Sequence, residues 1–320
     1  MFRKLPLILN ADQLINQSIR KTKKITIPDR DARYQTKKTI LARTESFVNN
    51  IILKLELYVK EFPSLDQLPP FYQDIIDIKI NSDKLKQSLG AVDWARKTCQ
   101  SIYVKQSSAL RKTGNIDFLK QKQKEIYGRI SSVLYQIDNQ LVFLAEAQNI
   151  MKKFPHIQDI PTIVIAGYPN VGKSSLLRHL SSAKPEIAMY PFTTKQIIVG
   201  HNTIQNNYTK QPYQIIDTPG LLDRPIEKRN NIEKQAIAAL THLADVIVFM
   251  IDPSETCGYT IHDQYHMLDF IKKIFEDKPI IVVENKSDII KTTSQELKIS
   301  CENKEGIDEL TKEIMQYLKS

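Results

Sequence analysis

The residues best suited to chemistry form a glycine-rich segment at 167–174, with the sequence G-Y-P-N-V-G-K-S. It fits the pattern G-x-x-x-x-G-K-S, in which backbone N–H groups surround phosphate oxygens, the lysine neutralises them and the serine hydroxyl binds Mg²⁺. An apolar run precedes the segment and a helical pattern follows it, which disfavours the alternative of a chance Gly-Lys-Ser turn. The residues expected to contact phosphate are Gly167, Tyr168, Pro169, Asn170, Val171, Gly172, Lys173, Ser174 and Ser175.

A second polar segment, D-T-P-G at 217–220, ends a later apolar run. A carboxylate at this place can hold Mg²⁺ through a water molecule, and the Gly220 N–H can reach a γ-phosphate. Taken alone, the tetrapeptide could also be a turn closed by the Asp217 side chain. Because it follows a phosphate loop, it predicts that Ser174 and Asp217 serve one Mg²⁺ ion.

A third segment, N-K-S-D at 285–288, has the side chains needed to recognise guanine. Asp288 can accept hydrogen bonds from the N1–H and the exocyclic amine of guanine, a donor pair that adenine lacks. Asn285 and Lys286 would brace the loop and cover the base, and a backbone N–H within Ser300 and Cys301 would donate to guanine O6. Each short match is weak alone, but all of them follow strands in order, and ligands of α/β sheets bind at that edge.

A threonine pair lies between the first two segments, in Y-P-F-T-T-K at 190–195. A threonine that completes the Mg²⁺ shell only when the γ-phosphate is present would make this loop a switch. We favour Thr194 and keep Thr193 as the alternative. With Lys173 and Gly220, Thr194 belongs to the predicted catalytic set.

These segments need a sheet to position them, and the second half of the chain has the pattern of one. Near-continuous apolar runs that alternate with helical stretches predict a mostly parallel sheet with helices on both faces, an α/β P-loop GTPase fold. A further strand is expected at the sheet edge, over 197–204. The runs lie at 162–167, 213–217, 245–252, 279–285 and 297–300.

The first half has a helical pattern almost throughout. Apolar residues recur every three or four positions over 31–61 and 117–153, and each stretch has one apolar stripe, so the helices must pack into a bundle. Shorter helical patterns lie at 71–80, 82–89 and 92–111. Because the pattern changes near 155–161, we expect an all-α bundle domain over 1–158 and the α/β domain over 159–320.

Charge also separates the two halves. Residues 1–160 have 27 Lys and Arg against 16 Asp and Glu, a net charge of +11, whereas residues 161–320 have 18 against 20, a net charge of −2. A basic half attracts polyanions such as nucleic acid or an anionic membrane surface, and we favour nucleic acid over a merely solvated helical surface. No nucleic-acid motif accompanies the charge, so Lys120, Lys122 and Lys124 are candidate contacts on charge alone.

Other composition features exclude several classes of protein. The three cysteines lie far apart, which predicts no disulfide framework and suits the cytoplasm. No apolar run approaches the ~20 residues that span a bilayer, so no membrane partner is expected. His262 and His266 have the spacing of zinc ligands on a helix, but no third ligand is evident and we expect no zinc site.

The motifs together resemble a known family. Residues 161–320 resemble an Obg-type GTPase domain through the segments above, including D-T-P-G-L-L-D-R-P at 217–225. The basic helical half and I-D-P-S-E-T-C-G-Y-T at 251–260 are similar to the nucleolar GTP-binding protein 1 (Nog) family. The resemblance implies GTP hydrolysis coupled to large ribosomal subunit assembly, with the helical domain on ribosomal RNA and assembly factors as further partners.

The sequence also departs from the family pattern. We expect a short form without the C-terminal extension of eukaryotic members and without the glycine-rich N-terminal domain of Obg. Cys301 stands where the family usually has alanine, and its backbone N–H should still serve the base. Two alternatives stay open: a stress or signalling switch with a protein effector, and a scaffold that binds nucleotide without turnover.

The expected rate of hydrolysis is low. Leu221 stands where Ras-like proteins have the glutamine that orients the attacking water, and leucine cannot do so. In related GTPases an asparagine at the position of Asn170 helps to hold K⁺ beside the phosphates, which adds Asn170 to the catalytic set as a candidate K⁺ ligand. Asn170 could instead only hydrogen-bond the loop, and Arg224 or a ribosomal activator could supply the charge.

Overall fold

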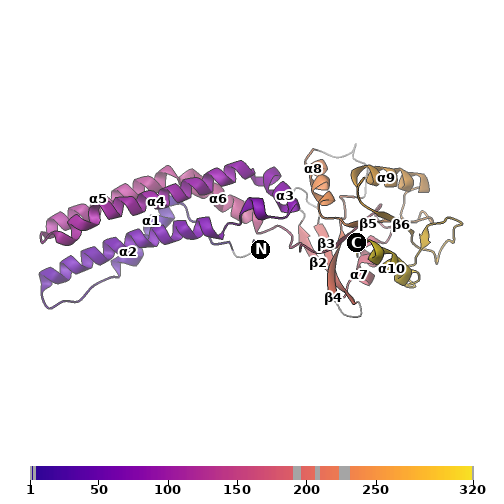
Figure 1. Ribbon diagram of the computed structural model, residues 1–320, viewed down its shortest axis with the longest axis horizontal. Helices are drawn as coiled ribbons and strands as arrows, with labels where there is room; N and C mark the ends of the chain where they lie inside the picture. Colours follow the sequence, from indigo (N-terminus) through magenta and orange to yellow (C-terminus); the bar gives the residue numbers. More distant parts are fainter. Residues whose placement is uncertain (1, 3–4, 190–195, 206–209, 223–230, 319–320) are drawn as a thin grey trace. The chain divides into compact units, whose positions relative to one another are not determined.

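The computed structural model describes the chain except residues 1, 3–4, 190–195, 206–209, 223–230 and 319–320 (Figure 1). The chain divides into two compact units. The helical unit comprises Met1–Gln67 and Ile80–Lys152, and the α/β unit comprises Leu68–Lys79 and Lys153–Ser320. The sequence indicated the same two classes of structure in the same order.

The helical unit is a bundle of helices, most of which are joined by short connections. The helices Ala32–Glu61 and Ser82–Lys112 are instead separated by residues 62–81, part of which belongs to the α/β unit. Asparagine or aspartate side chains cap several helix starts: Asn10, Asp31 and Asn115 each accept hydrogen bonds from backbone N–H groups of the first turn, which satisfies donors that the helix itself leaves unpaired. The helices are α1 (Ala11–Lys23), α2 (Ala32–Glu61), α4 (Ser82–Lys112), α5 (Ile116–Gln136) and α6 (Asp138–Met151).

The apolar stripes form the core of this bundle, as their spacing predicted. In α2, Phe47, Ile51 and Leu55 are fully buried, and in α5, Ile126 and Ile130 are fully buried. The helices are long, but in the part of the chain that the structure describes none is both long and apolar enough to cross a membrane.

Two predicted helix boundaries are wrong. The single helix expected over 117–153 is broken at Ile137, whose φ and ψ of −105° and 12° are not helical. The break frees Asp138 to start α6, where its Oδ1 accepts a hydrogen bond of 2.7 Å from the Ala11 N–H of α1. Conversely, the patterns at 82–89 and 92–111 are one helix, α4, because Gly90 has the space and the backbone of an ordinary helical residue.

The α/β unit is built on a seven-stranded sheet in the order β2-β3-β4-β1-β5-β6-β7. Strands β4, β1, β5, β6 and β7 are parallel neighbours, and β2 and β3 are antiparallel. The expected strand at 197–204 is β3, but β2 lies outside it and forms the edge. The strands are β1 (Thr162–Ala166), β2 (Glu186–Met189), β3 (Gln196–Gln205), β4 (Lys210–Asp217), β5 (Val246–Ile251), β6 (Ile280–Glu284) and β7 (Leu297–Lys298).

Strands β1 and β5, at the centre of the sheet, are almost entirely apolar because both faces of the sheet are covered. Every residue of β1 and of β5 is buried, as expected for parallel strands between helix layers. The helices of the unit are α3 (Pro70–Ile80), α7 (Lys173–Leu180), α8 (Asn231–Thr241), α9 (Ile261–Ile274) and α10 (Ile307–Leu318).

Helix α3 belongs to the α/β unit although it lies within the first half of the chain. The Tyr72 hydroxyl donates to the Pro155 carbonyl at 2.7 Å and accepts from the Ile157 N–H at 2.9 Å. The Asp74 carboxylate lies 3.2 Å from Nε2 of His242, which follows α8. The α/β unit therefore includes α3, because α3 packs with segments that come much later in the chain. A single division of the sequence at residue 158 would assign α3 to the helical domain.

Candidate functional site

The glycine-rich segment joins β1 to α7 at the carboxyl end of the sheet. Gly167 and Gly172 have φ angles of 136° and 107°, a region that favours glycine. A Cβ on Gly167 would lie 2.6 Å from the Met250 carbonyl oxygen, and one on Gly172 would lie 2.2 Å from Nδ2 of Asn285. Both glycines are thus required by conformation and by the close approach of neighbouring segments.

Lys173 starts α7 and is almost completely buried, with 7% of its surface exposed. Its Nζ donates to the carbonyl oxygens of Gly167 and Tyr168, at 2.8 and 2.6 Å. The ammonium group therefore lies inside the loop, next to the N-terminus of a helix whose dipole also favours an anion. Positive charge from both sources meets where the sequence predicted phosphate contacts.

Ser174 in α7 meets Asp217 at the end of β4. Asp217 ends β4 beside β1 and is fully buried, and its Oδ2 accepts a hydrogen bond of 2.7 Å from the Ser174 hydroxyl. A hydroxyl and a carboxylate at this separation are hard oxygen donors of the kind that Mg²⁺ prefers. The predicted pair therefore fits a magnesium ion. Thr193 and Thr194, the predicted third ligand, lie outside the described residues.

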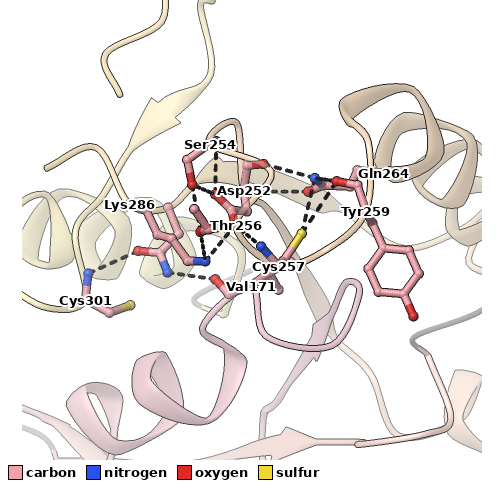
Figure 2. Close-up of polar contacts among 10 residues, drawn as sticks. Val171, Asp252, Ser254, Thr256, Cys257, Tyr259, Gln264, Lys286 and Cys301 are labelled. Atoms are coloured by element: carbon pink, nitrogen blue, oxygen red, sulfur yellow. Dashed lines mark hydrogen bonds and ion pairs between the residues drawn. The ribbon is translucent and has the colours of Figure 1, made fainter. Parts of the chain in front are cut away.

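The segments predicted to recognise guanine are joined to the phosphate loop by Asn285. This side chain is buried, its Nδ2 donates to the Val171 carbonyl at 2.7 Å, and its Oδ1 accepts from the Cys301 N–H at 3.1 Å (Figure 2). Asn285 thus connects the phosphate loop to the segment that contains Cys301. The Cys301 N–H, expected to donate to a base, donates to Asn285 in this structure.

Asp288 lies at the exposed end of the same loop. One of its oxygens, Oδ1, accepts from the Ser300 hydroxyl at 2.5 Å, which orients the carboxylate. Nearby, the Cys301 carbonyl lies 2.8 Å from Nε2 of His179 in α7. Burial, together with the Asp288 charge, raises the pKa of the Cys301 thiol to about 11, so the thiol stays protonated at neutral pH.

A fourth segment, residues 252–260 after β5, completes the site, and sequence reasoning missed its role. Asp252 is fully buried, and its Oδ2 accepts from Lys286 Nζ at 2.6 Å and from the Cys257 N–H at 2.8 Å (Figure 2). Its Oδ1 accepts from the Ser254 N–H at 3.0 Å. Burial alone would raise the pKa of Asp252, but the hydrogen bonds from Lys286, Ser254 and Cys257 outweigh burial, and the pKa lies below its usual value. Asp252 thus holds Lys286 as a charged pair.

The same segment is fixed to its surroundings on two further sides. The Gln264 side chain of α9 accepts from the Asp252 N–H at 2.7 Å and donates to the carbonyl oxygens of Asp252 and Tyr259, both at 3.0 Å. The Tyr259 ring stacks on Tyr168 of the phosphate loop, with 4.1 Å between ring centroids. A charged residue directly after a buried apolar strand was the available signal for Asp252.

The residues that the sequence singled out for hydrolysis differ in their surroundings. Leu221 is fully buried, so its side chain packs in the unit and offers no polar group to a water molecule. Asn170 is exposed and has a left-handed backbone, with φ of 64°. Gly220 also has a positive φ, 79°. Arg224 lies outside the described residues.

Comparison with known proteins identifies relatives of both parts of the chain. The family model described as the NOG1 N-terminal helical domain matches residues 2–158, and the model of nucleolar GTP-binding protein 1 (NOG1) matches residues 231–288. An uncharacterized protein of Methanocaldococcus jannaschii is 38% identical over 293 residues, which cover 90% of this chain and 81% of that protein.

Named relatives are longer than this chain. Nucleolar GTP-binding protein 1 of Arabidopsis thaliana is 37% identical over 268 residues, which are 83% of this chain but 39% of that protein. A solved structure from Plasmodium falciparum assigned the same name is 34% identical, with a TM-score of 0.46, over 52% of this chain and 90% of that one. On the two family models and these sequence relatives, the chain belongs to the nucleolar GTP-binding protein 1 family.

Proposed function

We propose that this chain binds GTP in the presence of Mg²⁺ and hydrolyses it to GDP and phosphate. The observation that carries the proposal is the meeting of separate segments at one sheet edge, joined by Ser174 with Asp217 and by Asn285 with Val171 and Cys301. Sheets of this type bind ligands at that edge. The names of the sequence relatives support the same ligand.

The chain's own groups have distinct tasks in this proposal. The Lys173 ammonium and the N–H groups of the loop would hold β- and γ-phosphate oxygens and oppose the charge that grows as the bond breaks. Mg²⁺, bound through Ser174 and Asp217, would supply further charge to the same oxygens. The Gly220 N–H would contact the γ-phosphate, and Thr194 would close the loop over it.

Base selection would belong to Asp288, Lys286 and the Asn285 loop. The exposed Asp288 carboxylate, oriented by Ser300, offers the acceptors that guanine N1–H and its amine require. Lys286, held by Asp252, would lie along the base. Because the Cys301 N–H already donates to Asn285, binding to guanine O6 would require that N–H to be shared or exchanged.

We propose slow hydrolysis in the isolated protein. The buried Leu221 cannot orient a water molecule, so positive charge must come from elsewhere. Asn170 could help to hold K⁺ beside the phosphates, since its side chain is exposed at the loop.

The cycle of GTP binding and hydrolysis would act as a switch in large ribosomal subunit assembly, with the basic helical unit on ribosomal RNA. The positive charge of the helical unit and the family of the chain support this role.

The test of guanine binding is Asp288→Asn in the full chain. The asparagine would face one guanine donor with its own NH₂ group, so we expect at least about a tenfold loss of GTP affinity. Xanthosine triphosphate, which has an acceptor in place of the amine, should bind the variant better than GTP does. Asp308→Asn, at the exposed start of α10, is the matched control. Unchanged GTP binding by Asp288→Asn would refute the assignment of the base site.

A further inference from the structure

Helices α4 and α5 of the helical unit form an antiparallel hairpin (Figure 1). A groove lies between these two helices. Its volume is about 650 Å³. The chain's single tryptophan, Trp94, lies in its wall with 47% of its surface exposed. A half-exposed indole offers a large flat contact area, and tryptophan is enriched at interfaces, so this groove is a candidate contact surface.

The charged residues that line the groove, within the described part of the chain, are all positive. They are Lys97 and Lys105 of α4 and Arg129 of α5. Lys97 and Arg129 also contact a carboxylate of their own helix, Asp93 at 2.7 Å and Glu125 at 3.6 Å. Both cations are more than half exposed, and such surface pairs contribute little, so an incoming phosphate can compete for them.

The remaining lining mixes polar and apolar side chains. Thr98, Ser101, Ser132 and Gln136 supply hydroxyl and amide groups that can both donate and accept hydrogen bonds. Ile102 and the buried Val133 are the apolar members of this remaining lining. From Trp94 to Lys105 helix α4 extends about 16 Å, since a helix rises about 1.5 Å per residue. The groove thus offers one aromatic face, a row of cations and base-edge partners.

We propose that this groove binds a short single-stranded RNA segment, with one unpaired base stacked on Trp94 and its phosphates against Lys97, Lys105 and Arg129. The proposal rests on the proposed role of the helical unit on RNA and adds the place and the kind of RNA. A single strand is required because bases within a duplex are already stacked and cannot reach an indole, whereas unpaired bases stack readily on aromatic side chains.

The single tryptophan gives a direct readout in the full, unmodified chain. Its fluorescence is measured during titration with a mixed-sequence RNA octanucleotide, the matching RNA duplex and polyglutamate, while labelled RNA reports binding independently. We expect the single strand to quench Trp94, and the duplex and polyglutamate to leave it nearly unchanged. Quenching by polyglutamate as strong as that by RNA would overturn the proposal in favour of an acidic protein partner.

Variants separate stacking from charge. Trp94→Leu should weaken binding of the single strand about tenfold without changing its salt dependence, and Trp94→Phe should restore part of the loss. Lys97→Gln and Lys105→Gln should each lower the log–log salt slope by about 0.7. Lys112→Gln, at the end of α4 outside the groove, is the matched control.

The outcomes also distinguish this inference from the proposed function. If the chain binds the octanucleotide but Trp94 fluorescence and the Trp94→Leu affinity do not change, the groove is not the site, and the RNA role of the helical unit survives. If labelled RNA does not bind the chain at all, both the groove and the RNA role are refuted.

Discussion

The two units of the chain differ in what they bury. In the α/β unit, charged groups are buried at the carboxyl edge of the sheet, among them Lys173 at the start of α7 and Asp217 and Asp252 at the ends of strands. In the helical unit, every buried polar residue within the described part of the chain is neutral, such as Thr44, and its charges lie on the surface. Burying a charge is costly unless the charge is paired, so buried charges indicate an organised binding site. Surface charges indicate only which class of partner is attracted. The proposed nucleotide site thus depends on buried charges in a fixed geometry, whereas the proposed RNA contacts of the helical unit depend mainly on exposed charge.

The largest expected effect comes from removing the buried ammonium. Lys173→Met should weaken GTP binding by about 100-fold or more, because the phosphates would lose a desolvated cation. Titration of the full chain with a fluorescent GTP analogue measures it. Lys97→Met in the helical unit is the control and should bind nucleotide as the wild type does. A Lys173→Met chain with wild-type affinity would remove the distinction between the two units.

A smaller loss should follow from releasing Lys286. Asp252→Asn removes the charged acceptor for Lys286, so we expect GTP and GDP affinity to fall about tenfold while turnover at saturating GTP is kept. Asp263→Asn, which disturbs only the start of α9, is the control. In a double-mutant cycle with Lys286→Gln the losses should be strongly non-additive, since one interaction is removed twice. Additive losses, or a fall in turnover alone, would contradict the positioning role of Asp252.

The next largest effect is expected on the rate of hydrolysis and tests the proposed role of Asn170 in the phosphate loop. Steady-state GTPase activity in KCl should exceed that in NaCl of equal ionic strength by several-fold, because a fixed cation opposes charge that develops as the bond breaks. Asn170→Ala should abolish the difference between the two salts. Equal wild-type rates in both salts would exclude a K⁺ role in the free protein and leave an activator or Arg224 as the source of charge.

The smallest effects are expected on the helical unit. Replacing Lys120, Lys122 and Lys124 with glutamine should flatten the salt dependence of RNA binding by the full chain, and the log–log slope should fall by about 0.7–0.9 for each phosphate that is no longer neutralised. A wild-type slope near zero would indicate a protein partner instead of RNA.

The sequence predicts some parts of the molecule more completely than others. The phosphate loop follows from spacing, since a strand, a tight turn and a helix bring Gly167 and Lys173 together. The Ser174–Asp217 pair joins two motifs, each of which is recognisable from its own local sequence. The buried stripes of the bundle follow equally directly from their period. Such features depend on local pattern, which the sequence contains.

Features that depend on distant contacts could not be predicted. The break at Ile137 allows Asp138 to accept a hydrogen bond from the Ala11 N–H, and Ala11 lies more than a hundred residues earlier in the chain. Helix α3 joins the α/β unit through Tyr72 and Asp74, whose partners lie far away in the sequence. Asp252 likewise acquires its role from Lys286, in another loop. A single sequence contains no local sign of these pairings.

The central claim is that the buried charges of the α/β unit form a site for guanine nucleotides. Calorimetric titration of the full chain with GTP, GDP and ATP in the presence of Mg²⁺ tests it most directly. We expect GTP and GDP to bind and ATP to bind at least about 100-fold more weakly, because Asp288 would face no donor pair on adenine. Equal affinity for ATP and GTP, or no binding of any of the three, would contradict it.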